Sequence, residues 1–188
     1  AFDQEQAQGY LKRLKERGSD KPIVGVGWRS MNLAVSRARL YLSAPQFAPI
    51  LDFEDVTFVN LQYAAVKREL DFLKAKTNGA FVSLDDVDLL DDLLAAAALT
   101  ACCDLVVTAN TSVAEIAGVL DVPSFRFGQN EPPLLLGQKN PPWHPSQRYF
   151  LLTSEMPATA VVPDLRAAIS DWLETFSPER RDKRLGLA

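Results

Sequence analysis

Short apolar runs alternate along the chain with segments whose apolar residues recur every three or four positions. The runs predict strands and the periodic segments predict helices. The predicted strands are 23–28, 56–61, 80–84, 105–108, 122–127 and 148–153. The predicted helices are 4–17, 43–51, 65–76, 89–101 and 164–176, with one more that begins at Thr111 or Ser112. Strands and helices therefore follow one another almost without exception.

Such alternation predicts parallel strands that are joined by right-handed crossovers. We expect an α/β fold, a doubly wound, Rossmann-like parallel sheet of about six strands with helices on both faces. Ligands of such sheets bind at the carboxyl ends of the strands, near the point where the strand order reverses. Polar residues follow four of the predicted strands, at 28–30, 62–63, 84–85 and 110–112, and should converge on one crevice.

A chain of 188 residues is long enough for one sizeable core. We expect a lead-in helix over 1–18, the main domain over 19–176 and a mobile charged tail over 177–188. Residues 128–145 predict a long loop that holds Trp143 and the single histidine, His144. The chain begins with Ala, so we expect it to be a piece of a longer protein.

Composition excludes several classes of function. The net charge is -4 and no basic stripe alternates with aromatic residues, so no nucleic-acid partner is expected. No apolar run is long enough to span a membrane. Cys102 and Cys103 are adjacent and have no second pair, which excludes a disulfide framework and favours a reducing, cytoplasmic location without a signal peptide.

The segment Asn110-Thr-Ser112 between a buried strand and a helix is the strongest candidate for a binding site. The start of a helix presents unpaired N–H groups and the positive end of a dipole, and two hydroxyls and an amide lie beside them here. An anion site is the functional interpretation; the alternative is that Thr111 and Ser112 only cap the helix. Arg37 and Arg39 lie near a strand end and form either a cationic contact or a solvated patch.

Other candidate chemistry is weaker. The aspartates of 85–92 match the first turn of a helix rather than a calcium loop, so no metal is expected. His144 reads as a structural or surface histidine. Gly25 and Gly27 do not continue into a dinucleotide fingerprint, and no Walker A motif is present. A helix start with hydroxyls and arginine suits a diphosphate, and Tyr63 could border a base or ribose, which leaves a nucleotide sugar.

Four segments carry a resemblance to a known family, in the order that the family uses: 24–30, 58–63, 104–123 and 142–150. The chain resembles the carboxyl-terminal, donor-binding half of GT-B glycosyltransferase-like proteins. Within them it is similar to the bacterial group that is associated with tetratricopeptide repeats and related to heptosyltransferases and O-GlcNAc transferase. The resemblance implies a nucleoside-diphosphate-sugar donor and no metal or other cofactor.

The resemblance also implies roles for residues. Asn110, Thr111 and Ser112 would wrap the diphosphate, and Arg37 would meet its charge. Gln62 and Tyr63 would reach the nucleoside, while Trp28, Arg29 and Ser30 would line the same cleft. Heptosyltransferase relatives carry Asp-Thr-Gly or Asp-Thr-Ala followed closely by His, whereas this chain has Asn110-Thr-Ser112 and then Glu115. Glu115 would bond ribose or sugar hydroxyls, or else lies on the helix surface.

The expected reaction is inverting transfer of a sugar to an acceptor hydroxyl, with positive groups at the departing diphosphate. The general base belongs to the amino-terminal half in such proteins, so no catalytic residue is assigned and the chain alone is expected to be inactive. Expected partners are a glycan or protein acceptor and a missing amino-terminal half or repeat domain. The alternative is a catalytically inactive binding or scaffolding module; an epimerase of the related two-domain kind is the third possibility.

Overall fold

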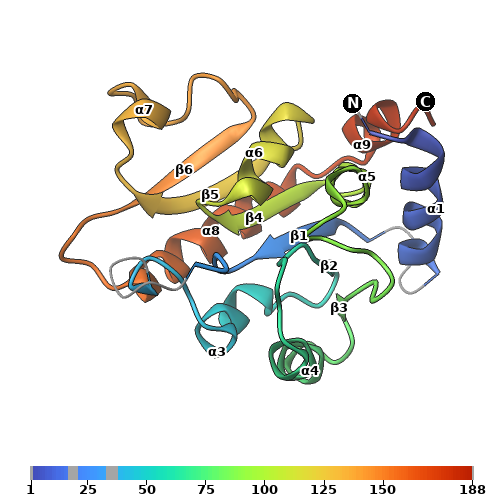
Figure 1. Ribbon diagram of the computed structural model, residues 1–188, viewed down its shortest axis with the longest axis horizontal. Coiled ribbons are helices and arrows are strands. Elements are labelled where there is room, and N and C mark those ends of the chain that lie inside the picture. The colour runs from blue at the N-terminus through green and yellow to red at the C-terminus, as the bar shows by residue number, and fades with distance from the viewer. Residues whose placement is uncertain (1, 17–20, 33–37, 188) are drawn as a thin grey trace.

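A computed structural model describes residues 2–16, 21–32 and 38–187 of the chain. Strands and helices alternate through this part of the chain (Figure 1). The strands are β1 (Ile23–Gly27), β2 (Thr57–Asn60), β3 (Phe81–Val82), β4 (Leu105–Ala109), β5 (Ser124–Gln129) and β6 (Gln147–Leu152). The helices are α1 (Gln4–Lys15), α3 (Ala44–Phe47), η1 (Ala48–Leu51), α4 (Lys67–Lys76), α5 (Leu93–Ala101), α6 (Ser112–Val119), α7 (Pro132–Leu135), η2 (Ala158–Val161), α8 (Val162–Glu174) and α9 (Glu179–Arg184).

The six strands form one parallel sheet in the order β3-β2-β1-β4-β5-β6. The chain first builds outward from β1 to β3 and then returns to the other side of β1 with β4. At the centre of the sheet, Val26 of β1 lies opposite Asn60 of β2 and Val107 of β4. The predicted doubly wound α/β sheet is confirmed, and its strand order reverses between β1 and β4.

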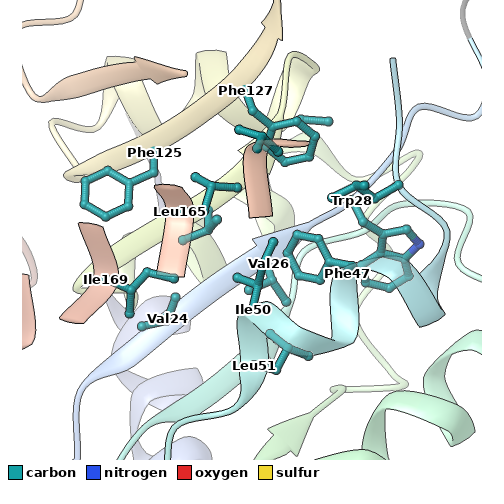
Figure 2. Packing of buried hydrophobic residues seen from close by; sticks show 14 of the residues in the cluster. Val24, Val26, Trp28, Phe47, Ile50, Leu51, Phe125, Phe127, Leu165 and Ile169 are labelled. Carbon is teal, nitrogen blue, oxygen red and sulfur yellow. The ribbon is translucent and has the colours of Figure 1, made fainter. Parts of the chain in front are cut away.

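Helices cover both faces of the sheet. Every second residue of the central strands points to one face of the sheet. There α3, η1, α4 and α8 pack on these side chains. Figure 2 shows this layer, in which Val24 and Val26 of β1 belong to one cluster with Phe47, Ile50 and, from α8, Leu165 and Ile169. On the other face lie α5 and α6, with α1 packed against α5. None of the helices in the described ranges has the length and apolar character needed to cross a membrane.

On the second face, small residues allow the backbone of the sheet and its neighbours to pack closely. Most of the buried residues of α5 are alanines, and Gly25 of β1 lies close to Leu61 and Cys103. A Cβ added at Gly25 would lie 2.4 Å from Leu61 Cδ1 and 2.8 Å from the Sγ of Cys103, distances at which atoms overlap. Both cysteines are buried and unpaired, and burial raises the pKa of Cys102 to about 12. Gly25 is therefore required by packing rather than by backbone conformation.

We expect Gly25→Ala to destabilise the protein by about 1–3 kcal/mol, the usual cost of overpacking a core. The measurement is the free energy of unfolding from urea denaturation. Gly9→Ala is the control, because nothing lies within 4 Å of a Cβ at Gly9 in the middle of α1. That change should be neutral or stabilise the helix, since alanine has the higher helix propensity. Equal effects of the two substitutions would contradict the packing argument.

Two expected boundaries move for identifiable reasons. The helix predicted over 89–101 begins only at Leu93, because the Asp92 side chain accepts a hydrogen bond from Ala95 N and caps it there. Asp88 likewise accepts from the N–H groups of Leu90 and Asp91 and holds the preceding turn. The long loop predicted over 128–145 contains the short helix α7. Asp92 thus caps the helix, as the sequence predicts for these aspartates, whereas Asp86 pairs with Arg13 of α1.

The prediction of a mobile tail over 177–188 is wrong for its helical part. Residues Glu179–Arg184 form α9, and Leu185 is completely buried. Arg181 Nη1 donates to Asp104 Oδ2 at 2.8 Å, in a pair that is almost fully buried. Gln8 of α1 donates to the carbonyl of Leu185, so the first and last helices lie side by side (Figure 1). The charged residues of this segment predict a solvated tail, but one of them, Arg181, forms a buried ion pair.

Candidate functional site

The carboxyl ends of β1 and β4 are neighbours at the centre of the sheet, where the strand order reverses. Residues 28–30 continue from β1, and residues 110–112 continue from β4 into α6. A parallel sheet leaves a crevice at this point, because the two connections run away to opposite sides. The sequence predicts that the candidate site residues meet here, and the structure brings only some of them together.

The start of α6 presents its first N–H groups without a side-chain cap. Thr111 occupies the N-cap position in extended conformation, but its side chain makes no capping hydrogen bond. Ser112, the first residue of the helix, is exposed. The contacts therefore do not support the alternative interpretation, in which the Thr111 side chain caps the helix. The positive end of the helix dipole faces outward, with two hydroxyls beside it.

Tyr63 links the ends of β2 and β1 to this helix start. Its hydroxyl donates to the Oγ of Ser30 at 3.4 Å, and its ring lines a small cavity of about 150 Å³ that Ser112 also borders. The same ring borders a more open groove of about 470 Å³ along the ends of β2 and β3, whose polar lining includes Asn60 and Ser83. Tyr63 and Ser112 thus line the same small cavity, and Ser30 is linked to them through its hydrogen bond with the Tyr63 hydroxyl.

Gln62 borders this groove, and its side-chain amide holds the backbone. It is buried, and its side-chain oxygen accepts from the N–H groups of both Trp28 and Arg29, at 2.9 and 2.8 Å. Its side-chain nitrogen donates to the carbonyl of Tyr63 at 2.7 Å. The predicted role of Gln62 as a ligand contact is replaced by a structural role, since this amide ties the end of β2 to the end of β1.

Arg29 turns away from the helix start and pairs with Glu69 of α4. Its Nε and Nη2 donate to the two carboxylate oxygens at 3.0 and 2.6 Å, and Nη2 also donates to the carbonyl of Ala64. Burial alone would raise the pKa of Glu69, but the hydrogen bonds from Arg29 and from the N–H of Val66 outweigh it and hold the pKa below its ordinary value. The guanidinium is thus neutralised by an ionised partner.

The prediction that Trp28 lines the cleft is wrong. Its side chain is completely buried and packs on Phe47, with ring centroids 6.0 Å apart (Figure 2). Trp28 follows Val24 and Val26 at a spacing of two, so it points to the same face of the sheet as those core residues. The other predicted cation, Arg37, lies outside the described residues. Arg39 is described and is exposed.

Asn110 and Glu115 belong to a second cluster, which centres on Arg126 of β5. Arg126 is buried, and its Nε donates to Asn110 Oδ1 at 2.7 Å, with Nη2 also in contact with the same oxygen. Nη2 further donates to Glu115 Oε1 at 2.6 Å. Asn110 completes its bonds by donating from Nδ2 to Glu131. This guanidinium therefore fixes both the residue before α6 and the acid one turn into it.

His144 lies on the other side of the Glu115 carboxylate. Its Nε2 is 3.0 Å from Glu115 Oε2, and its ring rests on Gly118 of α6, where an added Cβ would lie 2.4 Å from the imidazole Cγ. Burial alone would raise the pKa of Glu115, but Arg126 first and His144 second hold it below its ordinary value. The predicted structural role of His144 agrees with these contacts, and the charge of Glu115 is compensated within the protein.

Sequence reasoning missed Arg126 and Glu69. Arg126 was detectable in principle, because a charged residue between Phe125 and Phe127 in a buried strand must have a partner. Its partner Glu115 was noticed for its helix position only. Glu69 gives no such signal, since a glutamate in the first turn of a helix is ordinary. No group of three His, Cys, Asp or Glu residues that could hold a metal occurs in the described ranges.

The surface has a further hollow that none of the predicted residues reaches. A groove of about 710 Å³ lies between β6, the loop before it and α8. Cations and acids both line it, including Arg148, Lys139, Asp164 and Asp171. Arg148 is held over the ring of Phe150, 4.7 Å from its centroid. Because charges of both signs alternate around it, this groove favours no single ligand class.

Comparison with known proteins places this geometry in context. No family model matches the chain. Protein FlbA of Caulobacter vibrioides is 34% identical over 142 residues, which cover 76% of this chain and 24% of FlbA. The chain thus spans about a quarter of the length of this curated relative.

Among solved structures, the E. coli ADP-heptose LPS heptosyltransferase II superposes with a TM-score of 0.60 at 15% identity, over 87% of this chain and 52% of that one. The fold is glycosyltransferase-like. The six-stranded parallel sheet with helices on both faces corresponds to one half of a GT-B protein. The wall teichoic acid polymerase TagF gives a TM-score of 0.46 at 15% identity, over 97% of this chain and 42% of TagF.

Proposed function

We propose that the chain binds the diphosphate of a nucleoside-diphosphate sugar at the start of α6, as the donor-binding half of a GT-B glycosyltransferase. One observation carries the proposal: the start of α6 has no side-chain cap and lies at the reversal of strand order, and Ser112 there lines one cavity with Tyr63, whose hydroxyl donates to Ser30. Backbone N–H groups, a helix dipole and hydroxyls are the groups with which proteins bind phosphate.

Electrostatics supports the same site. An acid one turn into a helix would repel a diphosphate if its charge were free. Glu115 holds that position, but Arg126 and His144 both contact its carboxylate, and its nearest partner atom is only 2.6 Å away. The helix dipole is therefore not cancelled at its positive end. The arrangement also explains why a buried arginine stands in β5.

The groove beside Tyr63 is the proposed place of the nucleoside. It lies along the ends of β2 and β3, with a volume of about 470 Å³, and Tyr63 lines both this groove and the cavity at the start of α6. Its aromatic ring and its polar side chains, among them Asn60 and Ser83, suit stacking and hydrogen bonding to a base and ribose. The likeness of fold to an ADP-heptose LPS heptosyltransferase favours a sugar linked through a diphosphate.

The proposed reaction is inverting transfer of the sugar to a hydroxyl of a glycan or protein acceptor. The N–H groups of α6 would stabilise the departing diphosphate, where negative charge grows. The general base would come from a partner half, which we propose to be an amino-terminal α/β half or a repeat domain. The isolated chain should then bind donor but show no turnover. Glycosyl transfer by the purified chain would overturn this assignment of the base.

The experiment is a thermal-stability measurement with ADP, UDP, GDP and their sugars. A ligand present at about a hundred times its dissociation constant adds about 2.7 kcal/mol to the free energy of unfolding. We expect at least one member of the panel to raise the melting temperature in a concentration-dependent manner. A flat response to every member, repeated with the chain in its longer native context, would contradict the proposal.

A catalytically inactive binding or scaffolding module is the second candidate, and the state of Arg29 favours it. This cation lies at the end of β1, yet Glu69 and the carbonyl of Ala64 occupy its donors. Trp28 is also unable to contact a ligand, because its side chain is buried in the core. A crevice in which Arg29 and Arg126 are already paired would keep the fold without the ligand. The thermal panel separates the two candidates, because only the donor-binding module should respond.

Substituting Ser112 by aspartate should separate binding from stability. An acid in the first turn of a helix typically adds about 0.3–1 kcal/mol of stability. The same charge should abolish diphosphate binding, since it occupies the anion position. The measurements are the melting temperature alone and with the best nucleotide of the panel. Val119→Glu is the control, because it places the same charge at the exposed far end of α6 and should leave nucleotide binding intact.

A further inference from the structure

Three leucines at the start of α5 are exposed to an unusual degree. Leu90, Leu93 and Leu94 are 49%, 64% and 62% exposed. The helix packs on the sheet with its alanines, which allows close approach but turns the larger side chains outward. Single exposed leucines are common on protein surfaces, whereas three within five residues form an apolar patch. The patch is separate from the charged side chains of the Arg126 cluster.

The patch borders a hollow between two helices. Leu90 and Leu93 line the cavity of about 150 Å³, and Ile116 and Val113 of α6 form its opposite wall. Because α5 and α6 pack side by side, their outer surfaces form a groove with this cavity at its base. A groove between two helices with an apolar hollow is the shape that receives an amphipathic helix, whose apolar side chains insert as anchors.

Acidic residues surround the leucines. Asp88, Asp91 and Asp92 are exposed, and they alternate with the leucines along the chain. Backbone N–H groups of Asp91 and Leu90 hold the pKa of Asp88 below its ordinary value, so it is ionised at neutral pH. An apolar patch with an acidic rim is complementary to an apolar stripe flanked by lysine or arginine. It disfavours a second copy of the same patch, since like charges would face one another.

We propose that this leucine–aspartate surface, made of Leu90, Leu93, Leu94, Asp88, Asp91 and Asp92, docks a basic amphipathic helix of a partner protein. The leucines and the cavity bury the apolar side chains of that helix, and the aspartates pair with its flanking cations. The inference does not rest on nucleotide binding, but the surface shares Leu90 and Asp88 with the groove proposed for the nucleoside and shares the cavity of about 150 Å³ with the start of α6.

The test uses a fluorescein-labelled amphipathic peptide of about 15 residues, with leucine at helical spacing on one face and lysine on the other. Fluorescence anisotropy with the purified chain should show saturable binding that weakens as salt is raised. A peptide with glutamate in place of lysine should not bind. Absence of saturable binding by the lysine peptide, or equal binding of the glutamate peptide, would overturn the proposal.

Variants locate the binding on the surface. Leu90→Ser with Leu93→Ser should lower the peptide affinity at least tenfold at every salt concentration. Asp91→Asn with Asp88→Asn should lower it at low salt and flatten the salt dependence, while leaving the fold unchanged by circular dichroism. Val119→Ser, at a residue that is 72% exposed elsewhere on α6, should bind as the wild type does. Equal affinity of all variants, or a wild-type dimer that the leucine substitutions dissociate, would refute a heterologous helix as the occupant.

Discussion

Replacing Arg181 by methionine is expected to destabilise the protein by about 3–5 kcal/mol, the usual cost of leaving a buried charge without its partner. Asp104 is buried at the start of β4, and its Oδ2 accepts from both Arg181 Nη1 and the N–H of Ile23. Its Oδ1 has no hydrogen-bond partner among the residues that the structure describes. Loss of the guanidinium would leave a carboxylate in the core that cannot be solvated. The measurement is the free energy of unfolding from urea denaturation at pH 7.5.

The loss of unfolding free energy caused by Arg181→Met should grow as pH rises. Burial, offset only in part by Arg181, raises the pKa of Asp104 to about 6. A group whose folded-state pKa is raised contributes stability below its unfolded pKa and loses that contribution as pH rises through the folded value. Without Arg181 the pKa should rise further, so the penalty of the substitution should be small near pH 5 and grow toward pH 8. A pH-independent penalty would contradict this account.

Two controls sharpen the test of the buried pair. Arg180→Met removes an exposed arginine whose partner Asp121 lies 3.0 Å away, and it should change stability by no more than about 0.5 kcal/mol. Arg181→Met combined with Asp104→Leu should recover most of the loss, because an apolar pair of similar size needs no solvation. If the double variant is no more stable than Arg181→Met, lost packing of α9 rather than the orphaned charge explains the effect.

Replacing Arg126 by methionine should lower stability by about 2–3 kcal/mol and weaken nucleotide binding at least tenfold. Hydrogen bonds to a charged group contribute about 1.5–3 kcal/mol each, and partial exposure of Glu115 limits the loss. The binding effect has a different cause: Asn110 loses its anchor, and the uncompensated Glu115 places a negative charge beside the diphosphate. The measurements are urea denaturation and titration calorimetry with the best nucleotide of the panel.

Rescue distinguishes the electrostatic role of Arg126 from mere support of the fold. Adding Glu115→Gln to Arg126→Met removes the stranded charge and should restore part of the nucleotide affinity without restoring stability. Glu115→Gln alone should leave affinity nearly unchanged, because the wild-type carboxylate is already neutralised by its partners. Failure of the double variant to bind more tightly than Arg126→Met would show that the charge of Glu115 does not influence the site.

The fold could be predicted from the sequence because its determinants are local. Runs such as Leu105–Ala109 are apolar at every position, as strands buried on both faces are, and the alternation with helices leaves a doubly wound sheet as the natural arrangement. The helix start at Ser43 was predictable from its serine and the proline that follows, whereas the helix capped by Asp92 was predicted to begin too early, at Leu89. These signals need no knowledge of distant contacts.

The site was harder to predict because its residues contact partners that are distant in sequence. Arg29 and Trp28 follow β1 and were expected to face a ligand, yet Glu69 of α4 and Phe47 of α3 bind them. Gln62 was expected to contact a nucleoside and instead bonds backbone groups. Arg181 looked like part of a solvated tail and is a core residue. A sequence shows which side chains are polar but not which of them are in contact in the folded protein.

The most direct test of the donor-site proposal is an amide NMR titration of the isotope-labelled chain with each nucleoside diphosphate of the panel. The account predicts saturable shifts of the N–H signals of Ser112 and Val113 with at least one nucleotide, accompanied by Ser30 and Tyr63 across the crevice. Unchanged signals at the start of α6 with every nucleotide would contradict it. So would shifts confined to the groove between β6 and α8.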